Sequence, residues 1–180
     1  MKILLVGGSK SGKSMLAQRL ARSLHGTAPM YYYAAMDPVD DEDRERIRKH
    51  VKDRDGWGFT TVERARNVSE EKLDPSGTVL FDSVTALLAN EMFGDPPAAD
   101  SARHTLSELM SLSGSVSNFV CVADELFRDG TEHCGLTEEY RRGLAFVLNS
   151  LAEGFDAVCE VVCSVPKVYK GELPPIGDKI

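Results

Sequence analysis

The architecture of the chain is set near its start, by the octapeptide Gly7-Gly8-Ser9-Lys10-Ser11-Gly12-Lys13-Ser14. The octapeptide matches the phosphate-loop pattern Gly-x-x-x-x-Gly-Lys-Ser/Thr. It follows an apolar run, residues 3–6, and precedes residues 13–24, whose apolar side chains repeat at helical spacing. These flanks predict a strand buried on both faces and an amphipathic helix, which is the context in which the motif holds phosphate groups.

The loop residues have distinct expected tasks at a polyphosphate. Glycines let backbone N–H groups wrap around the phosphates, and the start of the helix adds positive potential. Lys13 is expected to reach the outer phosphates as a catalytic residue, and the Ser14 hydroxyl is placed to bind Mg²⁺. The simpler alternative is an ordinary glycine-rich turn, but Lys13 and Ser14 together favour a nucleotide site.

The rest of the chain alternates between strand and helix patterns. Strands are predicted at residues 31–35, 59–62, 78–81, 118–123 and 157–165. Helices are predicted at about 38–52, 83–92 and 137–153, and another follows the turn at 94–100 and ends at about residue 112. A Thr-x-Glu signal at Thr137 is expected to open the last helix. Such alternation implies right-handed crossovers. We therefore expect one α/β domain over residues 1–180, a RecA-like P-loop NTPase fold in three layers, with helices on both faces of a mainly parallel sheet.

Composition excludes several classes of protein. The chain is 42% hydrophobic and 27% charged, and its net charge of -7 opposes binding to nucleic acid or an anionic membrane. No run approaches the roughly 18 apolar residues of a membrane span, and the first apolar run is too short for a signal peptide. The four cysteines form no Cys-x-x-Cys pair, so we expect reduced packing residues in a cytoplasmic protein.

Two strand ends carry candidate acidic residues. Asp82 follows the apolar strand at 78–81, where P-loop enzymes place a carboxylate near the magnesium ion. The same residue could instead cap the next helix, and both roles can coexist. Asp124 and Glu125 follow the strand at 118–123 and form a second candidate, because α/β sheets bind ligands at the carboxyl ends of their strands.

His50 is the most informative of the four histidines. It follows Arg46 by four residues and precedes Arg54 by four, so the three side chains share one face of the predicted charged helix. Two guanidinium groups would lower the imidazole pKa and leave a neutral nucleophile able to attack an α-phosphate. The alternative is a solvated histidine on a polar helix. No histidine spacing suggests a zinc site.

In order along the chain, several motifs together resemble one family. They are the GGSKSGKS loop, Tyr33-Ala34-Ala35, Asp40-Asp41-Glu42, Arg46-Ile47-x-x-His50, Thr61-x-Glu63 and Phe81-Asp82-Ser83-Val84-Thr85. The family is the bifunctional adenosylcobinamide kinase and adenosylcobinamide-phosphate guanylyltransferase of cobalamin biosynthesis. The resemblance implies phosphorylation of the aminopropanol hydroxyl by GTP or ATP, then transfer of GMP from GTP through a guanylylated histidine.

The resemblance also implies roles for particular residues and partners. His50 matches the nucleophile, and Ser14 and Asp82 match the Mg²⁺ side of the site. The expected nucleotide-binding residues are Gly7, Gly8, Ser9, Lys10, Ser11, Gly12, Lys13, Ser14, Ala35, Met36, Lys52, Asp53, Arg54, Glu63 and Asp82. The family forms homo-oligomers, and its members bind a corrinoid substrate.

The sequence departs from the family pattern at three places. Ala35 stands where members usually have Thr, and the Asn-Glu-Val-Gly run is replaced by Asp124-Glu125-Leu126-Phe127. A Gly-Arg-Val-Asn run near the long helix is replaced by Ala145-Phe146-Val147-Leu148. The resemblance therefore supports guanylyl transfer more strongly than it supports the details of corrinoid binding or of the kinase step.

Two other functions stay open on the sequence alone. One is a different P-loop small-molecule or nucleotide kinase, in which Arg141 and Arg142 would clamp the transferred phosphoryl group. The other is a nucleotide-dependent regulatory switch. The sequence leaves undecided whether both activities are retained, which nucleotide donates phosphate, what contacts the corrinoid, and the number of subunits.

Overall fold

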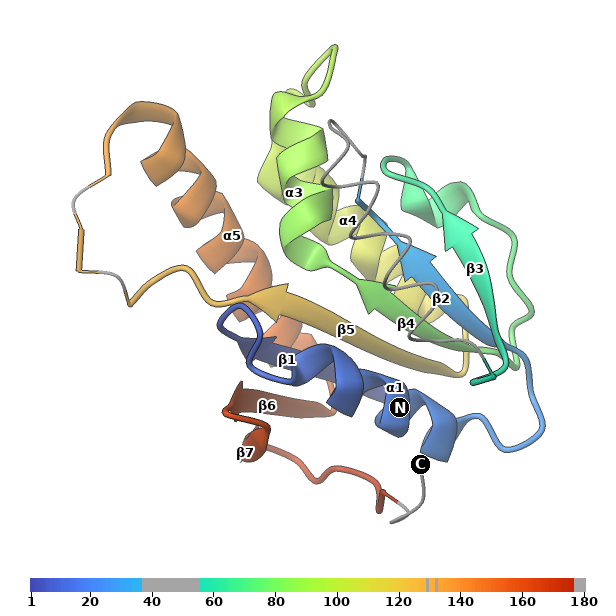
Figure 1. Ribbon diagram of the computed structural model, residues 1–180. Helices are drawn as coiled ribbons and strands as arrows, with labels where there is room; N and C mark the ends of the chain where they lie inside the picture. Colours follow the sequence, from blue (N-terminus) through green and yellow to red (C-terminus); the bar gives the residue numbers. More distant parts are fainter. Residues whose placement is uncertain (37–55, 129, 132, 177–180) are drawn as a thin grey trace.

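The computed structural model describes residues 1–36, 56–128, 130–131 and 133–176. Within them, the strands form one seven-stranded sheet with the order β3-β2-β4-β5-β1-β6-β7 (Figure 1). The predicted helix at 38–52 and four predicted site residues, His50, Lys52, Asp53 and Arg54, lie outside the described residues. The described elements are β1 (Lys2–Gly7), α1 (Lys13–Leu24), β2 (Met30–Ala34), β3 (Phe59–Glu63), the 3₁₀ turn η1 (Val68–Glu70), β4 (Thr78–Asp82), α3 (Val84–Phe93), α4 (Ser101–Gly114), β5 (Asn118–Asp124), α5 (Gly135–Gly154), β6 (Ala157–Val162) and β7 (Val165–Lys170).

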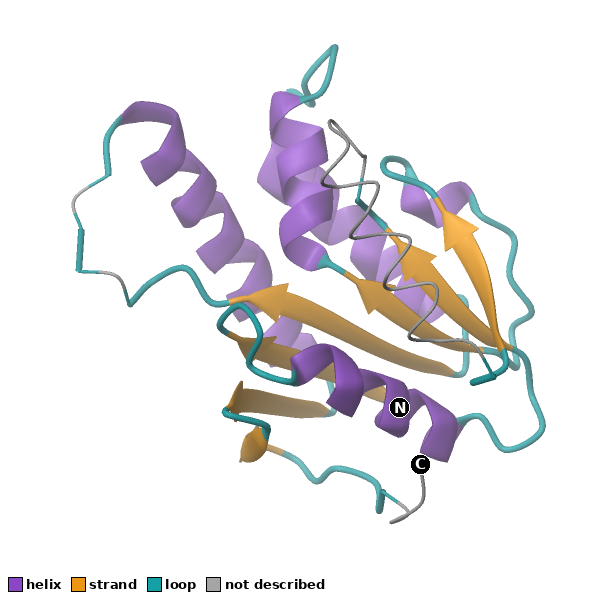
Figure 2. Ribbon diagram, viewed as in Figure 1, coloured by secondary structure: helices purple, strands orange, loops and turns teal. Residues whose placement is uncertain are grey.

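Helices cover both faces of the sheet, and alternating strand residues supply the two cores (Figure 2). Ile3 and Leu5 of β1 pack on the face covered by α1. Leu4, between them, packs on the opposite face, in the core to which α3, α4 and α5 contribute. All three side chains are at most 1% exposed. The predicted three-layer α/β fold is confirmed, because a strand buried on both faces needs a helix layer on each side.

The sheet is parallel except at one edge. β1 pairs in parallel with β5 and β6, and β2 and β4 continue the parallel arrangement toward β3. Only β6 and β7, among the described strands, pair antiparallel. The register sets Gly7 opposite Asp124 and sets Ala34 opposite both Glu63 and Asp82. The ends of five strands therefore bring the candidate residues to one edge of the sheet.

The prediction of one strand over residues 157–165 is wrong. β6 ends at Val162, and the chain turns back through Cys163 and Ser164, which have φ angles of 49° and 65°. Positive φ at both central residues is the geometry of a tight two-residue hairpin turn. Such turns usually carry Asn-Gly, so Cys-Ser between two valine-rich runs gave no turn signal.

The start of α5 and the cysteines also differ in part from expectation. α5 begins at Gly135, two residues before Thr137, and its N-cap Cys134 makes no side-chain hydrogen bond. All four cysteines are free thiols, as expected, but only Cys121 and Cys159 are buried, whereas Cys134 and Cys163 are exposed. No helix among the described residues is long and apolar enough to cross a bilayer.

Candidate active site

The P-loop joins β1 to α1 and holds Lys13 in place. Gly12, the N-cap of α1, has a φ of 93°, a conformation that side chains other than glycine rarely adopt. The Lys13 ammonium donates to the Gly8 carbonyl at 3.3 Å and pairs with the Asp124 carboxylate at 2.6 Å. Lys13 is only 8% exposed. The lysine predicted to meet phosphate is therefore neutralised by a carboxylate from the neighbouring strand.

The β6–β7 turn packs against the loop. The Ser164 N–H donates to the Ser11 carbonyl at 2.7 Å, and a Cβ at Gly12 would collide with Ser164 Oγ. At Gly7 a Cβ would meet the Val161 carbonyl at 2.6 Å. Gly7 and Gly12 are thus both needed for close packing, and Gly12 is also needed for its backbone conformation. Sequence reasoning missed this contact because it missed the turn.

Asp124 is the centre of a polar cluster beside Lys13. Its second carboxylate oxygen accepts from the Thr85 hydroxyl at 3.3 Å. The Tyr140 hydroxyl donates to the Thr85 carbonyl at 2.9 Å. Burial raises the pKa of Tyr140 to about 12, and the nearby Asp124 charge adds to the shift. Of the two acidic candidates, the structure brings Asp124 to the P-loop lysine.

Asp82 lies at the end of β4, and β5 separates that strand from β1. Its carboxylate accepts from the Tyr32 hydroxyl at 2.7 Å. The N-cap of α3 is Ser83, whose side chain accepts from the Ala86 N–H at 3.2 Å. The capping alternative for Asp82 is therefore wrong, and its carboxylate stays at the strand end.

The remaining described candidates end β2 and β3. Ala35 and Met36 follow β2, and Glu63 is an exposed residue at the end of β3. Asn90 of α3 holds both strand ends, because its amide donates to the Ala35 carbonyl at 2.6 Å and to the Ala65 carbonyl at 2.9 Å. Sequence reasoning missed Asn90, although an amide within a largely apolar helix was a usable signal.

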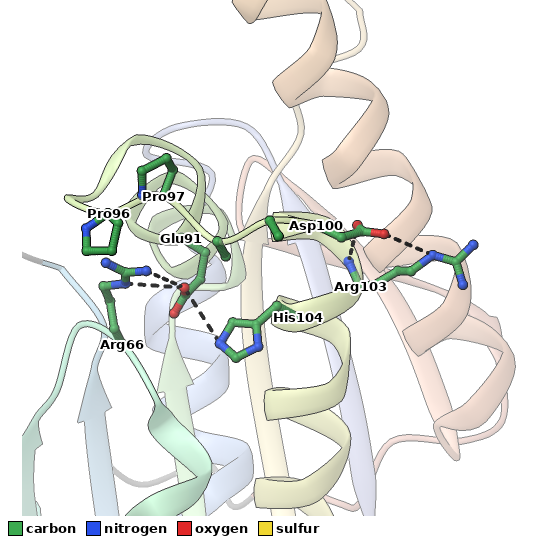
Figure 3. Close-up of a pocket in the computed structure, with 9 residues that line it drawn as sticks. Arg66, Glu91, Pro96, Pro97, Asp100, Arg103 and His104 are labelled. Carbon is green, nitrogen blue, oxygen red and sulfur yellow. Dashed lines mark hydrogen bonds and ion pairs between the residues drawn. The ribbon is translucent and has the colours of Figure 1, made fainter.

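A cavity of about 580 Å³ lies at the turn between α3 and α4 (Figure 3). At its inner wall Glu91, which is 0% exposed, accepts from Arg66 Nε at 3.2 Å and Nη2 at 3.1 Å. His104 Nε2 lies 3.7 Å from the same oxygen. The other Glu91 oxygen has no hydrogen-bond partner among the described residues. The cluster ties the segment after β3 to α3.

A second cavity, of about 430 Å³, lies between the end of β5 and the start of α5. It is lined by Glu125, Leu126, Arg128, His133, Thr137, Tyr140 and Arg141. Of the two arginines named from the sequence, Arg141 lines this cavity. Arg142 points elsewhere, because it is 79% exposed and pairs with Glu138 at 3.0 Å.

The P-loop at the carboxyl edge of a mainly parallel sheet defines the class of P-loop nucleotide-binding proteins. Within that class, the model of the family described as cobinamide kinase / cobinamide phosphate guanyltransferase matches residues 3–168, so the chain belongs to this family. The chain is accordingly a kinase and guanylyltransferase of adenosylcobalamin biosynthesis.

The chain is similar to known proteins in sequence and in fold. The bifunctional adenosylcobalamin biosynthesis protein CobP of Pseudomonas aeruginosa is 28% identical over 176 residues, which cover 96% of this chain and 99% of the relative. The crystal structure of the flagellar accessory protein FlaH from Methanocaldococcus jannaschii has a TM-score of 0.52 at 14% identity, over 95% of this chain and 78% of that one. The second likeness concerns the fold alone.

Proposed function

We propose that this chain carries out both reactions on one nucleotide-binding edge. It would phosphorylate the aminopropanol hydroxyl of adenosylcobinamide with GTP or ATP, then transfer GMP from GTP to adenosylcobinamide phosphate and release pyrophosphate. The observation that carries the proposal is Lys13, held at 2.6 Å from Asp124 in a loop with the complete phosphate-binding motif. Family membership supplies the substrates.

In the kinase step, the P-loop residues 7–14 bind the donor triphosphate through backbone N–H groups. Lys13 exchanges its contact with Asp124 for the outer phosphates, because a polyphosphate offers more negative charge than one carboxylate. Ser14 and Asp82 are the residues proposed to hold Mg²⁺. A hydroxyl and a carboxylate suit this ion, which usually keeps several waters and adds substrate phosphates as ligands. Bound there, Mg²⁺ would neutralise charge on the transferred phosphoryl group.

In the guanylyl step, His50 is the proposed nucleophile toward the α-phosphorus of GTP. This assignment rests on the sequence spacing and the family, since His50 lies outside the described residues. Lys52, Asp53 and Arg54, also outside, are proposed to contact the same nucleotide. Ala35, Met36, Glu63 and Asp82 are proposed to contact guanosine, and the common strand-end position of these four supports that role.

Location and assembly complete the proposal. We place the enzyme in the cytoplasm as a homo-oligomer with no nucleic-acid partner. Light scattering coupled to size-exclusion chromatography tests the assembly, and a mass equal to one 19.7 kDa chain would contradict it.

The guanylyl step is tested by trapping its intermediate. Incubation with Mg²⁺ and GTP labelled at the α-phosphate should leave a labelled GMP on the protein through a phosphorus–nitrogen bond, which is acid-labile and base-stable. His50→Ala should lose the label. His104→Ala is the matched control and should keep it, because His104 lies by the α3–α4 cavity, beside Glu91.

Two outcomes would count against this assignment. An unlabelled wild-type protein would refute a covalent mechanism. A labelled His50→Ala protein would place the nucleophile at another residue. Loss of the label supports the assignment when circular dichroism shows the variant to be folded.

A further inference from the structure

The structure points to the cavity between β5 and α5 as the phosphoryl-acceptor site. We infer that it binds the alcohol arm of the corrinoid before phosphoryl transfer and the resulting phosphate monoester afterwards, with Arg141 as the residue that distinguishes the two. The inference rests on the proposed function and assigns a place to its second substrate.

The cavity adjoins the donor site through two direct links. The Glu125 N–H donates to the carbonyl of Gly7, the first residue of the P-loop, at 3.0 Å. Tyr140, also in the lining, bonds the backbone of Thr85, whose hydroxyl contacts Asp124 beside Lys13. An acceptor in this cavity would therefore lie next to the phosphates that the P-loop and Lys13 bind, as direct phosphoryl transfer requires.

The charge of the lining suits an anion. Among the described lining residues, Arg128 and Arg141 are cationic and Glu125 is the one carboxylate, and Arg128 also pairs with Glu160, outside the lining, at 2.7 Å. The chain as a whole has a net charge of -7. A basic cavity in an acidic protein focuses field at that point, and guanidinium groups bind phosphate in a bidentate manner.

The size and rim of the cavity fit one arm of a large substrate. Its volume of about 430 Å³ is at the lower end of small-molecule sites. It would take an aminopropanol arm while the macrocycle stays outside. Leu126 lines the cavity, Phe127 and Leu136 are sequence neighbours of lining residues, and the three side chains are 36%, 38% and 63% exposed. These apolar side chains offer the macrocycle a surface to cover.

Phosphoryl transfer in this cavity needs a group that accepts the hydroxyl proton, and the lining supplies one. The acceptor hydroxyl oxygen forms a bond to the γ-phosphorus of the donor, and the bond from that phosphorus to the β,γ-bridging oxygen breaks. The nucleoside diphosphate leaves with the bridging oxygen. The hydroxyl proton passes to the Glu125 carboxylate, whose first oxygen accepts from the Phe127 N–H at 2.7 Å, leaving the second oxygen as the proton acceptor.

Arg141 and Arg142 form a matched pair for the test. They are adjacent on α5, yet Arg141 lines the cavity and Arg142 pairs with Glu138 on the helix surface. Full-length wild type, Arg141→Ala and Arg142→Ala are compared for binding of adenosylcobinamide and of its phosphate by equilibrium dialysis, and for kinase turnover with ATP and GTP.

We expect Arg141→Ala to weaken binding of the phosphate about 10- to 100-fold, since charge-assisted hydrogen bonds are lost. Binding of adenosylcobinamide, whose alcohol arm is uncharged, should change far less. Arg142→Ala should stay within about twofold for both ligands, as expected of an exposed pair. Arg141→Lys should recover part of the lost affinity, because it restores the charge without the planar fork.

Equal weakening of both ligands by Arg141→Ala would indicate a structural role and overturn the inference. So would wild-type affinities in Arg141→Ala, or equal losses in the two alanine variants. A wild-type protein that neither binds nor phosphorylates adenosylcobinamide would refute the kinase function itself. The failure of the site and the failure of the function are therefore separate results.

Discussion

At the scale of single residues, Lys13 and Asp124 form an ion pair that nucleotide has to open. The lysine side chain is 10% exposed and the carboxylate 38%. Asp124→Asn leaves the buried ammonium without its counter-ion, so we expect the nucleotide-free protein to lose about 1 to 2 kcal/mol of stability. Bound triphosphate supplies the missing charge. Thermal unfolding should therefore show a larger nucleotide-induced rise in Tm for the variant than for wild type.

Glu138→Gln is the control for this prediction. It removes a carboxylate from an exposed i,i+4 pair with Arg142, away from the loop. Its nucleotide-induced shift in Tm should equal that of wild type. If Asp124→Asn also shows the wild-type shift, the lysine does not exchange Asp124 for phosphate on binding.

Local sequence signals predicted the phosphate loop, but they did not show which of the two acidic candidates contacts its lysine. Lys13 has a fixed position within the motif, so the spacing of the motif was enough to predict its place in the loop. Asp82 and Asp124 each follow a buried strand, and only the strand order, with β5 next to β1, brings Asp124 to Lys13. Asn90 and Glu91 were missed because the hydrogen-bond partners of their side chains lie 25 or more residues away in the chain.

At the scale of elements, the pair of Arg66 and Glu91 joins the segment after β3 to α3. Glu91 is fully buried and Arg66 is its cationic partner among the described residues, at 3.1 Å. Arg66→Ala leaves a buried carboxylate uncompensated, and we expect a loss of about 3 kcal/mol in the free energy of unfolding. Urea denaturation measures it.

Arg64→Ala is the matched comparison, because Arg64 is about as exposed as Arg66 but pairs at 2.9 Å with Glu70, whose side chain is 65% exposed. We expect little change in its urea midpoint. Glu91→Gln should cost less than Arg66→Ala, since it removes the charge together with the need for a partner. The reverse order of the two variants would show that Glu91 is neutral in the folded protein.

Most described elements were predictable, and the exceptions have physical causes. α1 and β5 stand out from their apolar periodicity, because both are anchored in the core. The division of the last strand into β6 and β7 was not predictable. Residues 161–165 form one β-favouring run, and the turn inside it lacks glycine. Cys163 and Ser164 hold positive φ angles in a two-residue turn that packs against the P-loop.

At the scale of the whole molecule, the overall charge and the local charges have opposite signs. The acidic surface keeps the net charge at -7, while the phosphate loop and the β5–α5 cavity gather Lys13, Arg128 and Arg141. Added salt should therefore weaken nucleotide binding less than it weakens binding to an extended basic surface, because the loop's contacts are partly buried and short. The fold supplies anion sites that the average composition opposes.

The alkaline limit of folding is also a property of the whole molecule, set by buried phenols and thiols. Burial raises the pKa of Tyr140 to about 12 and raises the pKa values of Tyr33 and Cys121 further. The unfolded state ionises first, near pH 10 for tyrosine. The stabilisation is therefore complete below the unfolded pKa and is lost as the pH rises toward the folded one. Urea midpoints should fall between about pH 10 and 12, less steeply in Tyr140→Phe, whereas Tyr169→Phe, at an exposed position, should keep the wild-type slope.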